Sequence, residues 1–260
     1  MRPGGPPATP GTVHLVGAGP GDPGLITLRG ARLVESSTLV AYDHLVAPEL
    51  VDLAPADAAR WEVGKRPGSG WAQRDIDRLI VEAARVGHAV VRLKGGDPFV
   101  LGRGGEEAAA CVAAGVPFEV VPGITSAVAA PAAAGIPVTH RGLAPGFAVV
   151  TGHEDPDKPG EQLDWAALAA FPGTLVILMG VGSLAVTTAR LIAAGRDRAT
   201  PAAAVRWGTT PLQEVVEAPL GRLADAVRDA GLTPPATVVV GDVVAMRHVL
   251  HGAPVLVGAA

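Results

Sequence analysis

Residues 12–23, TVHLVGAGPGDP, combine a short apolar strand with a glycine-rich loop that follows it at once. The apolar part, Thr12–Gly17, has the character of a buried strand that glycines bring to an end. Residues 25–36 then have helical spacing, and residues 38–42 (TLVAY) form a second apolar strand. Strands that alternate with helices are typical of a parallel sheet, so this stretch predicts the α/β class.

The same alternation continues along the rest of the chain. Residues 74–86 form an amphipathic helical pattern, with Ile76, Leu79, Ile80 and Ala83 on one face. The other expected helices are 106–114, 126–134, 184–194 and 221–230, and the other expected strands are 89–93, 117–121, 147–151, 174–179, 202–206, 214–218 and 236–240.

A break in this pattern falls at residues 139–146 (THRGLAPG), where glycine, proline and charge cluster between apolar runs. We therefore predict two α/β lobes, an N-terminal one over residues 12–142 and a C-terminal one over residues 143–260. Ligands in such folds bind beyond the carboxyl ends of strands, so we expect the active site in the cleft between the lobes. Residues 1–11 are rich in proline and glycine, and we expect them to form a disordered tail.

The composition sets limits on the partners. The chain has 260 residues, 48% of them hydrophobic and 18% charged, which is typical of a soluble globular protein. No apolar run reaches the roughly 18 residues that span a bilayer, so no membrane partner is expected. The net charge of −4 argues against a nucleic-acid partner. The single cysteine, Cys111, cannot form an internal disulfide and fits a reducing, cytoplasmic location, where we expect it to be inert packing.

The loop at residues 17–23 has some features of a dinucleotide-binding fingerprint. That fingerprint needs a sixth-position glycine, where this chain has Asp22, and Pro20 removes an N–H donor that a pyrophosphate would use. Asp43, at the end of the second strand, can still take the place of the acid that binds a ribose in NAD proteins. On this motif, an NAD-binding α/β protein and a tight structural turn both remain alternatives.

A second glycine-rich loop, Lys94–Phe99 (KGGDPF), is more informative. Two glycines allow a ligand to approach the backbone closely, Asp97 adds an acceptor, and Pro98 fixes the turn. Such a loop suits a cationic, hydroxyl-bearing ligand such as S-adenosylmethionine. The run GRGGEE (102–107) follows and places Arg103 at the start of a helix whose two glutamates suit a helix N-terminus. The seven histidines show no metal-ligand spacing, so no metal site is expected.

Seven segments together resemble the uroporphyrinogen-III C-methyltransferases of the tetrapyrrole methyltransferase superfamily, in that family's order. They are VGAGPGDPGLITLRGARLVESSTLVAYDHLV (16–46), VGKRPG (63–68), VRLKGGDPFVLGRGGEE (91–107), VPGITSAVAAPAAAGIPVTHRG (121–142), VTGHE (150–154), ILMG (177–180) and VRWGTTPLQEVV (205–216). The resemblance implies the tetrapyrrole methylase fold, S-adenosylmethionine as methyl donor with S-adenosylhomocysteine as product, and a homodimer. It also implies methylation of uroporphyrinogen III at C2 and C7 to give precorrin-2, for sirohaem or cobalamin synthesis.

The resemblance assigns roles to residues that match the family's motifs. Asp43 matches the proton acceptor and Lys65 the proton donor. Matches to donor-binding positions are Pro20, Gly95, Gly96, Asp97, Val100, Thr125, Ser126, Met179 and Gly208. Matches to positions that face the tetrapyrrole are Arg103, Glu106, Arg141 and Met179. The chain departs from many relatives at His44, where arginine is common, and at Ser126, where alanine is common.

Three alternatives stay open at this point. Another precorrin methyltransferase of the same fold, such as a precorrin-4 or precorrin-2 enzyme, is the nearest, although the GRGGEE loop and the run 139–141 favour the early enzyme. An NAD-binding protein would bind nicotinamide and not S-adenosylmethionine. An RNA ribose methyltransferase would need a basic surface. We further expect the chain to methylate without oxidising its product or inserting metal.

Overall fold

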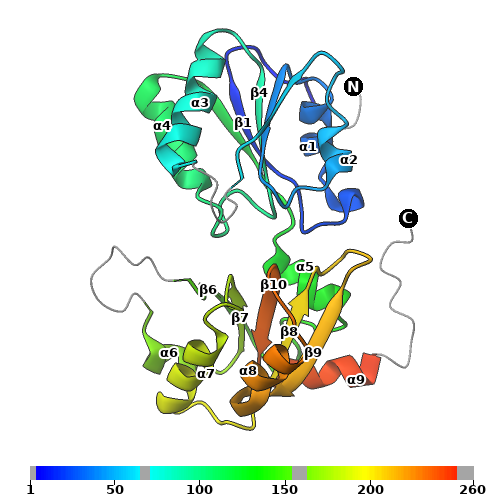
Figure 1. Cartoon of the computed structure of the whole chain (residues 1–260), viewed down its shortest axis with the longest axis vertical. Helices are drawn as coiled ribbons and strands as arrows, with labels where there is room; N and C mark the ends of the chain where they lie inside the picture. Colours follow the sequence, from blue (N-terminus) through cyan, green and yellow to red (C-terminus); the bar gives the residue numbers. More distant parts are fainter. Residues whose placement is uncertain (1–3, 65–70, 154–162, 251–260) are drawn as a thin grey trace. The chain divides into compact units, whose positions relative to one another are not determined.

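The computed structural model describes residues 4–64, 71–153 and 163–250. Contacts divide the chain into two compact units, Met1–Thr125 and Ser126–Ala260, which are described separately (Figure 1). Each unit contains one five-stranded sheet with helices on its faces, as the α/β prediction requires. Among the described residues, no helix combines the length and the apolar character that a membrane span requires.

The sheet of the first unit is wholly parallel. Its strand order is β3 (Ala59–Glu62), β2 (Leu39–Tyr42), β4 (Val90–Lys94), β1 (Val13–Gly17) and β5 (Phe118–Val121). In the centre of the sheet Val16 lies beside Leu93 on one side and Val121 on the other. Because all five strands run the same way, the loops that follow them gather at one edge of the sheet.

Helices cover both faces of this sheet (Figure 1). On one face, α1 (Leu28–Val34) and α2 (Pro48–Val51) bury Leu33, Val34 and Leu50 against the strands. On the other face, α3 (Gln73–Arg85) and α4 (Gly104–Ala114) bury Ile76, Ile80 and Cys111. Both strand faces are therefore covered, which explains why β1 and β4 are continuous buried runs and not alternating ones.

The second unit contains a mixed sheet. Its order is β6 (Phe147–Thr151), β7 (Thr174–Leu178), β10 (Ala236–Val240), β8 (Pro201–Arg206) and β9 (Glu214–Pro219). Strand β6 is parallel to β7, and β10 is antiparallel to both β7 and β8. The carboxyl ends of β6, β7 and β8 therefore lie at the same edge of this sheet.

Two separate apolar clusters lie on the two faces of the second sheet. The helices α6 (Trp165–Ala170), α7 (Leu184–Ala193) and α8 (Leu220–Asp229) pack on one face. On the other face lie α5 (Ser126–Ala133) and a short 3₁₀ helix, η2 (Asp242–Ala245), which α9 (Met246–Leu250) continues. The same three-layer arrangement therefore holds in this unit.

The boundary between the units differs from the predicted one at residues 142 and 143. Helix α5 packs on β7, β8 and β10, and Ala130, Ile136 and Ala144 belong to one buried cluster with Val205 and Val239. Residues 126–142 therefore lie with the second unit. The sequence break at residues 139–146 is a turn inside this unit, in which His140 pairs with Ala144.

Residues 4–11, which the composition predicts to be a disordered tail, pack against the first unit instead. The Ala8 side chain is 7% exposed and joins the cluster beneath α1 and α2. The Ala8 N–H donates to Ser36 Oγ at 2.8 Å, and the Thr9 N–H donates to Nε2 of buried His14 at 3.1 Å. The Arg29 guanidinium also donates to the Gly4 and Pro6 carbonyls. Hydrogen bonds and the burial of Ala8 hold this segment in place, and neither produces a periodic apolar pattern in the sequence.

The predicted helix at residues 25–36 forms two elements. Residues Pro23–Leu25 are a 3₁₀ helix, η1, and α1 begins only at Leu28, after Thr27. The Thr27 hydroxyl accepts a hydrogen bond from the Gly30 N–H at 3.0 Å and so caps α1. The start of the helix is therefore set by this threonine and not by the preceding apolar residues.

Cys111 tests the packing of α4 directly. Its side chain is fully buried, and burial together with the Glu107 and Asp77 charges raises the pKa of its thiol to about 11. At pH 8 about one molecule in a thousand would then carry the reactive thiolate. We expect iodoacetamide at pH 8 to alkylate the denatured chain and to leave the native chain unmodified, as mass spectrometry would measure. Rapid labelling of the native chain would contradict the burial of Cys111.

Candidate functional site

The carboxyl edge of the first sheet brings together most of the residues that the sequence singles out. Gly17 ends β1, Asp43 follows β2, Gly95 follows β4, and Gly123 lies shortly after β5. Residues far apart in the chain are therefore neighbours in space. This edge is the place where parallel α/β sheets bind ligands.

Three of these loops are held together by close backbone contacts. A Cβ atom on Gly17 would lie 2.4 Å from the Gly123 Cα, and one on Gly123 would lie 2.2 Å from the Gly96 carbonyl oxygen. Gly19 and Gly96 also exchange two N–H···O bonds, at 3.2 and 2.7 Å. No other residue type fits at Gly17 or Gly123 without movement of the backbone. The glycines thus serve first to pack the loops against one another.

Gly95 stands in a different environment from Gly96. A Cβ atom on Gly95 would meet no atom within 4 Å, so its Cα faces open space. Its N–H donates to Asp43 Oδ2 at 3.3 Å. Gly96 has φ +67° and lies within the loop contacts described above. Of this predicted donor-binding pair, Gly95 is therefore the residue that a ligand can approach directly.

Asp97 ties two loops together. Its Oδ1 accepts a hydrogen bond from the Phe99 N–H at 2.8 Å, and its Oδ2 accepts one from the Gly123 N–H at 3.0 Å. Both carboxylate oxygens therefore bind backbone amides. Each oxygen keeps a further lone pair for a ligand hydroxyl, so this arrangement is compatible with the predicted contact to the donor.

The open space at Gly95 allows a sharp test of donor binding. We expect Gly95→Ala to weaken S-adenosylmethionine binding at least about tenfold, or about 1.4 kcal/mol, because the new methyl group fills space that the ligand needs. The fold should be unaffected, since no protein atom lies near that methyl group. Calorimetry measures the Kd, and Tm reports the fold.

The matched control for this test is Gly105→Ala, in α4, where a Cβ atom also meets nothing within 4 Å. The control should keep the wild-type Kd. An unchanged Kd in folded Gly95→Ala would show that the donor does not lie against this glycine.

Asp43 is the outer member of a buried chain of charges. Its Oδ1 accepts a hydrogen bond from Arg92 Nη2, and its side chain is 30% exposed. Arg92 is buried in β4 and also donates through Nε to Glu107 Oε1 at 2.9 Å. The same Glu107 oxygen accepts from Lys94 Nζ at 3.0 Å. Asp43 therefore joins the solvent-facing edge of the sheet to an ion network beneath it.

The two cations of this network respond differently to burial. Desolvation lowers the pKa of Lys94, and the nearby Arg92 charge acts in the same direction. Desolvation also acts to lower the pKa of Arg92, but the Asp43 and Glu107 carboxylates outweigh it and raise that pKa. Arg92 is therefore the fixed positive charge of the network. Of the described carboxylates that Arg92 contacts, Asp43 is the one open to solvent.

The GRGG loop folds back on the KGGDPF loop. A Cβ atom on Gly102 or Gly104 would lie 2.9 or 2.4 Å from the Pro98 carbonyl oxygen. Between these glycines, Arg103 has φ +59°, a conformation that costs a residue with a side chain about 1–3 kcal/mol. Leu101, next to the predicted donor-binding Val100, has φ +53°. Two residues of this loop, Leu101 and Arg103, therefore hold a strained backbone conformation.

Arg103 and Glu106, both predicted to face the tetrapyrrole, contact each other. The Arg103 Nε and Nη2 atoms donate to the two Glu106 carboxylate oxygens at 2.8 and 2.7 Å. Both side chains are about half exposed, and an exposed pair of this kind is worth at most about 1 kcal/mol. A carboxylate of a ligand can therefore replace Glu106 on the Arg103 guanidinium at little cost.

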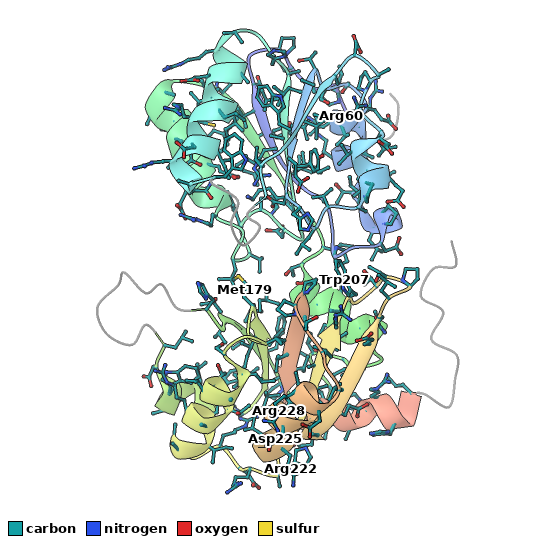
Figure 2. All side chains as sticks on the ribbon, viewed as in Figure 1. Arg60, Met179, Trp207, Arg222, Asp225 and Arg228 are labelled. Carbon is teal, nitrogen blue, oxygen red and sulfur yellow. The ribbon has the colours of Figure 1, made fainter. Side chains whose placement is uncertain are left out.

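A second group of predicted residues lies at the carboxyl edge of the second sheet. Met179 follows β7 and Trp207 follows β8, and Figure 2 shows both at this edge. Met179, Trp207 and Thr209 have φ of +56°, +47° and +73°. Met179 is 54% exposed. Strained residues with side chains are most often found at binding sites, so this edge is a second candidate surface.

Gly208 lies buried between the strained residues Trp207 and Thr209. A Cβ atom there would lie 2.5 Å from the Ala130 Cβ, so the loop packs directly on α5. The Gln213 side chain holds this arrangement, because it accepts from the Thr209 N–H at 3.0 Å and donates to the Ala133 carbonyl at 3.2 Å. Gly208 is thus required for packing, whatever contact it makes with a donor.

The remaining predicted residues are less defined by their contacts. Pro20 is half-buried after β1, Thr125 and Ser126 are half-buried at the start of α5, and Arg141 is exposed in the turn that His140 begins. Lys65, the predicted proton donor, lies outside the described residues. Within the described ranges no group of histidine, cysteine, aspartate or glutamate side chains is arranged to hold a metal.

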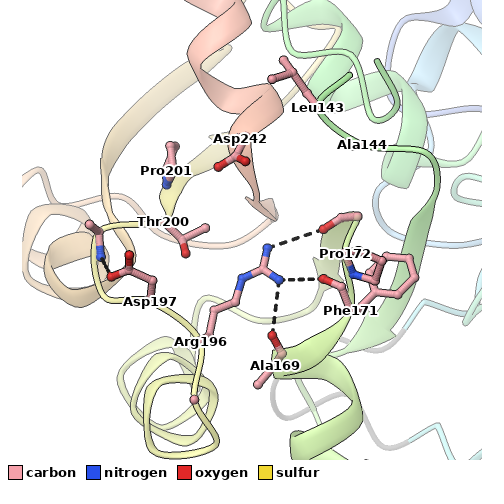
Figure 3. Close-up of a pocket in the computed structure, with 13 residues that line it drawn as sticks. Leu143, Ala144, Ala169, Phe171, Pro172, Arg196, Asp197, Thr200, Pro201 and Asp242 are labelled. Atoms are coloured by element: carbon pink, nitrogen blue, oxygen red, sulfur yellow. Dashed lines mark hydrogen bonds between the residues drawn. The ribbon is translucent and has the colours of Figure 1, made fainter. Parts of the chain in front are cut away.

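A cavity of about 400 Å³ in the second unit does not coincide with these residues (Figure 3). It is lined by the starts of β7 and β8, the opposite edge from Met179 and Trp207. The Arg196 guanidinium extends into it and donates to the Phe171 carbonyl at 2.7 Å and to the Ala169 carbonyl at 3.4 Å. Because the Arg196 guanidinium binds backbone carbonyl groups of the segments that line the cavity, we interpret the cavity as a packing gap between those segments.

The structure does not favour the dinucleotide alternative. Asp22, at the position of the missing sixth glycine, accepts a hydrogen bond from the Gly24 N–H at 2.7 Å and caps η1. A pyrophosphate site needs a helix N-terminus directly after the glycines, but α1 begins only at Leu28. The loop after β1 pairs instead with the loop after β4, through Gly19 and Gly96.

The site includes three residues to which sequence reasoning gave no role in it: Arg92, Lys94 and Glu107. The sequence signal for these residues is the pair of charges inside the apolar run AVVRLK (89–94). A buried strand tolerates a charge only where an opposite charge or a hydrogen-bond partner compensates it. Glu107 was interpreted as a partner of the helix dipole. Its carboxylate is fully buried and pairs with Arg92 and Lys94, and the helix-dipole interpretation does not include these two ion pairs.

The chain is similar in sequence to a known protein family and to several of its members. Residues 12–224 match the family model of the Tetrapyrrole (Corrin/Porphyrin) Methylases. Over 241 residues the chain is 48% identical to the S-adenosyl-L-methionine-dependent uroporphyrinogen III methyltransferase of Methanosarcina barkeri, which covers 92% of this chain and 94% of that protein. It is 49% identical to siroheme synthase 1 of Serratia proteamaculans over 94% of this chain, but it spans about half (51%) of that protein.

A solved structure agrees with the fold and with the nature of the ligand. The uroporphyrin-III C-methyltransferase of Thermus thermophilus, crystallised with S-adenosyl homocysteine, is 43% identical in sequence. The match has a TM-score of 0.77 and covers 90% of this chain and 99% of that one.

Proposed function

Because this chain belongs to the tetrapyrrole methylase family, we propose that it transfers methyl groups from S-adenosylmethionine to uroporphyrinogen III. The observation that carries the proposal is the juxtaposition of Gly95, which faces open space, with the half-exposed Asp43 carboxylate at one sheet edge. The products implied by the resemblance are precorrin-2, methylated at C2 and C7, and S-adenosylhomocysteine.

The residues present fit the methyl donor. Gly95 leaves its Cα face open, and the Asp97 carboxylate oxygens keep lone pairs for a ligand hydroxyl. When bound, S-adenosylmethionine supplies a methyl group on a sulfonium, which is already an electrophile. The protein therefore has to position the donor and the substrate and accept the proton that the substrate loses. It needs no metal to activate the methyl group.

We propose that Asp43 accepts that proton. Attack by a substituted pyrrole carbon leaves positive charge on the ring, and a proton must then leave the ring nitrogen or an adjacent bridging carbon. A carboxylate with one face open can stabilise this charge and accept the proton. Arg92 and the Gly95 N–H hold the other side of the Asp43 carboxylate. Lys65 is the proposed proton donor.

Arginine side chains suit the substrate, which carries several carboxylate groups. A guanidinium can bind a carboxylate through two parallel hydrogen bonds, as Arg103 does with Glu106. We assign Arg103, Glu106, Arg141 and Met179 to the tetrapyrrole. The donor is assigned to Pro20, Gly95, Gly96, Asp97, Val100, Thr125, Ser126, Met179 and Gly208.

The assembly and location follow the resemblance as proposals. We propose a homodimer in the cytoplasm that feeds sirohaem or cobalamin synthesis. Light scattering coupled to size-exclusion chromatography would measure the mass in solution, and a monomer at micromolar concentration would count against the dimer.

A substrate comparison tests the proposed function. The purified chain is given S-adenosylmethionine and, separately, uroporphyrinogen III, precorrin-2 or precorrin-4, and methylated products are separated by chromatography. We expect turnover only of uroporphyrinogen III and its monomethylated intermediate. Preference for a later precorrin would assign the chain to another member of the family. Calorimetric binding of NAD in place of S-adenosylmethionine would assign it to a different class.

A further inference from the structure

We propose that Glu107, acting through Arg92, is a positioning residue that holds the Asp43 carboxylate in its working orientation. This inference rests on the proposed role of Asp43. Glu107 contacts neither reactant in the proposal and lies in α4, where it binds Arg92 through Nε while Asp43 binds it through Nη2.

The geometry forms one continuous chain of contacts. Arg92 donates to Asp43 through Nη2 and to Glu107 through Nε, and its Nη1 donates to the carbonyls of Ala41 and Leu93, both at 3.3 Å. All three guanidinium nitrogens are therefore engaged. Because the guanidinium is planar and rigid, fixing its Nε end at Glu107 also fixes where Nη2 meets Asp43.

Stability alone does not account for this network. The Glu107 side chain is fully buried, and its Oε2 has no hydrogen-bond partner among the described residues. A buried carboxylate with an unsatisfied oxygen is costly, and well-packed apolar residues often stabilise a fold as well as a buried ion network does. The network is therefore better explained by what it does to its one solvent-facing carboxylate, Asp43.

Charge balance sets the direction of the effect. Asp43 and Glu107 balance Arg92 and Lys94. Without the Glu107 charge, the two buried cations would have Asp43 as the remaining carboxylate of the network. Arg92 would also lose the contact that fixes its Nε end, and the Asp43 carboxylate would lose its fixed orientation, so kcat should fall.

Neighbouring elements contribute further polar groups to the same region. From α3, Gln73 Nε2 donates to Asp77 Oδ1 at 2.9 Å and to Glu107 Oε1 at 3.4 Å. Burial raises the pKa of Asp77, and the charges of Glu107 and Glu106 add to that effect. Cys111, one helical turn after Glu107, is a protonated thiol at neutral pH. The mutational test therefore leaves α3 unchanged and alters only Glu107, Arg92 and Asp43.

The experiment is a double-mutant cycle between Glu107→Gln and Asp43→Asn. In the wild-type background we expect Glu107→Gln to lower kcat at least about tenfold, with the donor Kd and the tetrapyrrole KM unchanged. In the Asp43→Asn background the same change should lower kcat no further, because the group through which Glu107 acts is already lost. A purely structural role would lower Tm in both backgrounds and leave kcat of the folded protein intact.

Two further variants guard the interpretation. Arg92→Lys keeps the buried charge but cannot contact Asp43 and Glu107 through one rigid fork, so it should reproduce the loss of kcat if Glu107→Gln fails to fold. Glu119→Gln is the matched control. Like Glu107, Glu119 pairs with an arginine, Arg29, and its second partner is His14, away from the site. It should keep the wild-type kcat.

The outcomes separate the two claims. A wild-type kcat in folded Glu107→Gln and Arg92→Lys, with a strong loss in Asp43→Asn, would overturn the positioning role alone. A loss in Glu107→Gln that multiplies with that of Asp43→Asn would also overturn it. A wild-type kcat in Asp43→Asn would instead overturn the role of Asp43 in the proposed function.

Discussion

Replacing Asp43 by asparagine should lower kcat for methyl transfer by roughly 10²–10⁴, because asparagine keeps the shape of the side chain and loses its ability to accept a proton. The donor Kd should stay near the wild-type value, since the Cα face of Gly95 remains open to the ligand. Single-turnover kinetics and calorimetry measure the two quantities separately.

The same chemical change at Asp164 provides the control. Asp164 caps α6 by accepting from the Ala167 N–H at 2.9 Å, and asparagine is an equally good cap. Asp164→Asn should leave kcat, Kd and Tm unchanged. A wild-type rate for Asp43→Asn would exclude Asp43 as the proton acceptor and would direct attention to other carboxylates.

Replacing Arg141 by alanine should raise the KM for uroporphyrinogen III by roughly 10- to 150-fold, the equivalent of about 1.5–3 kcal/mol for a charge-assisted contact. The donor Kd should stay nearly unchanged. Arg141→Lys should restore only part of the affinity, because an ammonium cannot reproduce a two-pronged contact with a carboxylate. Steady-state kinetics with each variant measure this effect.

Arg228 is the matched control for this prediction. It is an exposed arginine on α8 that pairs with Asp225 at 2.8 Å, and Figure 2 shows both side chains on that helix. Arg228→Ala should keep the wild-type KM. If Arg141→Ala and Arg141→Lys both behave in the same way as this control, Arg141 is a surface residue and the tetrapyrrole binds elsewhere.

Of the described strands, all but β3 could be predicted from the sequence, and several short helices could not. Strands β1, β6 and β10 lie within a residue of their predicted bounds, because each is an apolar run between glycines or polar residues. Helices α2 (Pro48–Val51) and α6 and strand β3 (Ala59–Glu62) were missed. The sequences of α2 and β3, PELV and ARWE, mix charged and apolar residues without a periodic pattern, and these elements form because the neighbouring strand or helix supplies their contacts.

The candidate site shows the same limit at the level of side chains. The glycine-rich motif singled out Gly95 and the family resemblance singled out Asp43, because both leave a mark in the sequence. The pairing of Arg92 with both Asp43 and Glu107 joins β2, β4 and α4, and no local pattern encodes it. Gly95 faces open space, whereas Gly96 lies within the loop contacts. This difference likewise depends on Gly123, which approaches Gly96 from another loop.

The most direct test of the central claim is incubation of the purified chain with uroporphyrinogen III and donor that carries an isotopically labelled methyl group. Mass spectrometry of the tetrapyrrole should show a product that has gained two labelled methyl groups, with release of two S-adenosylhomocysteine molecules per tetrapyrrole. A tetrapyrrole that gains no label, under conditions in which the chain is folded and binds the donor, would contradict the account.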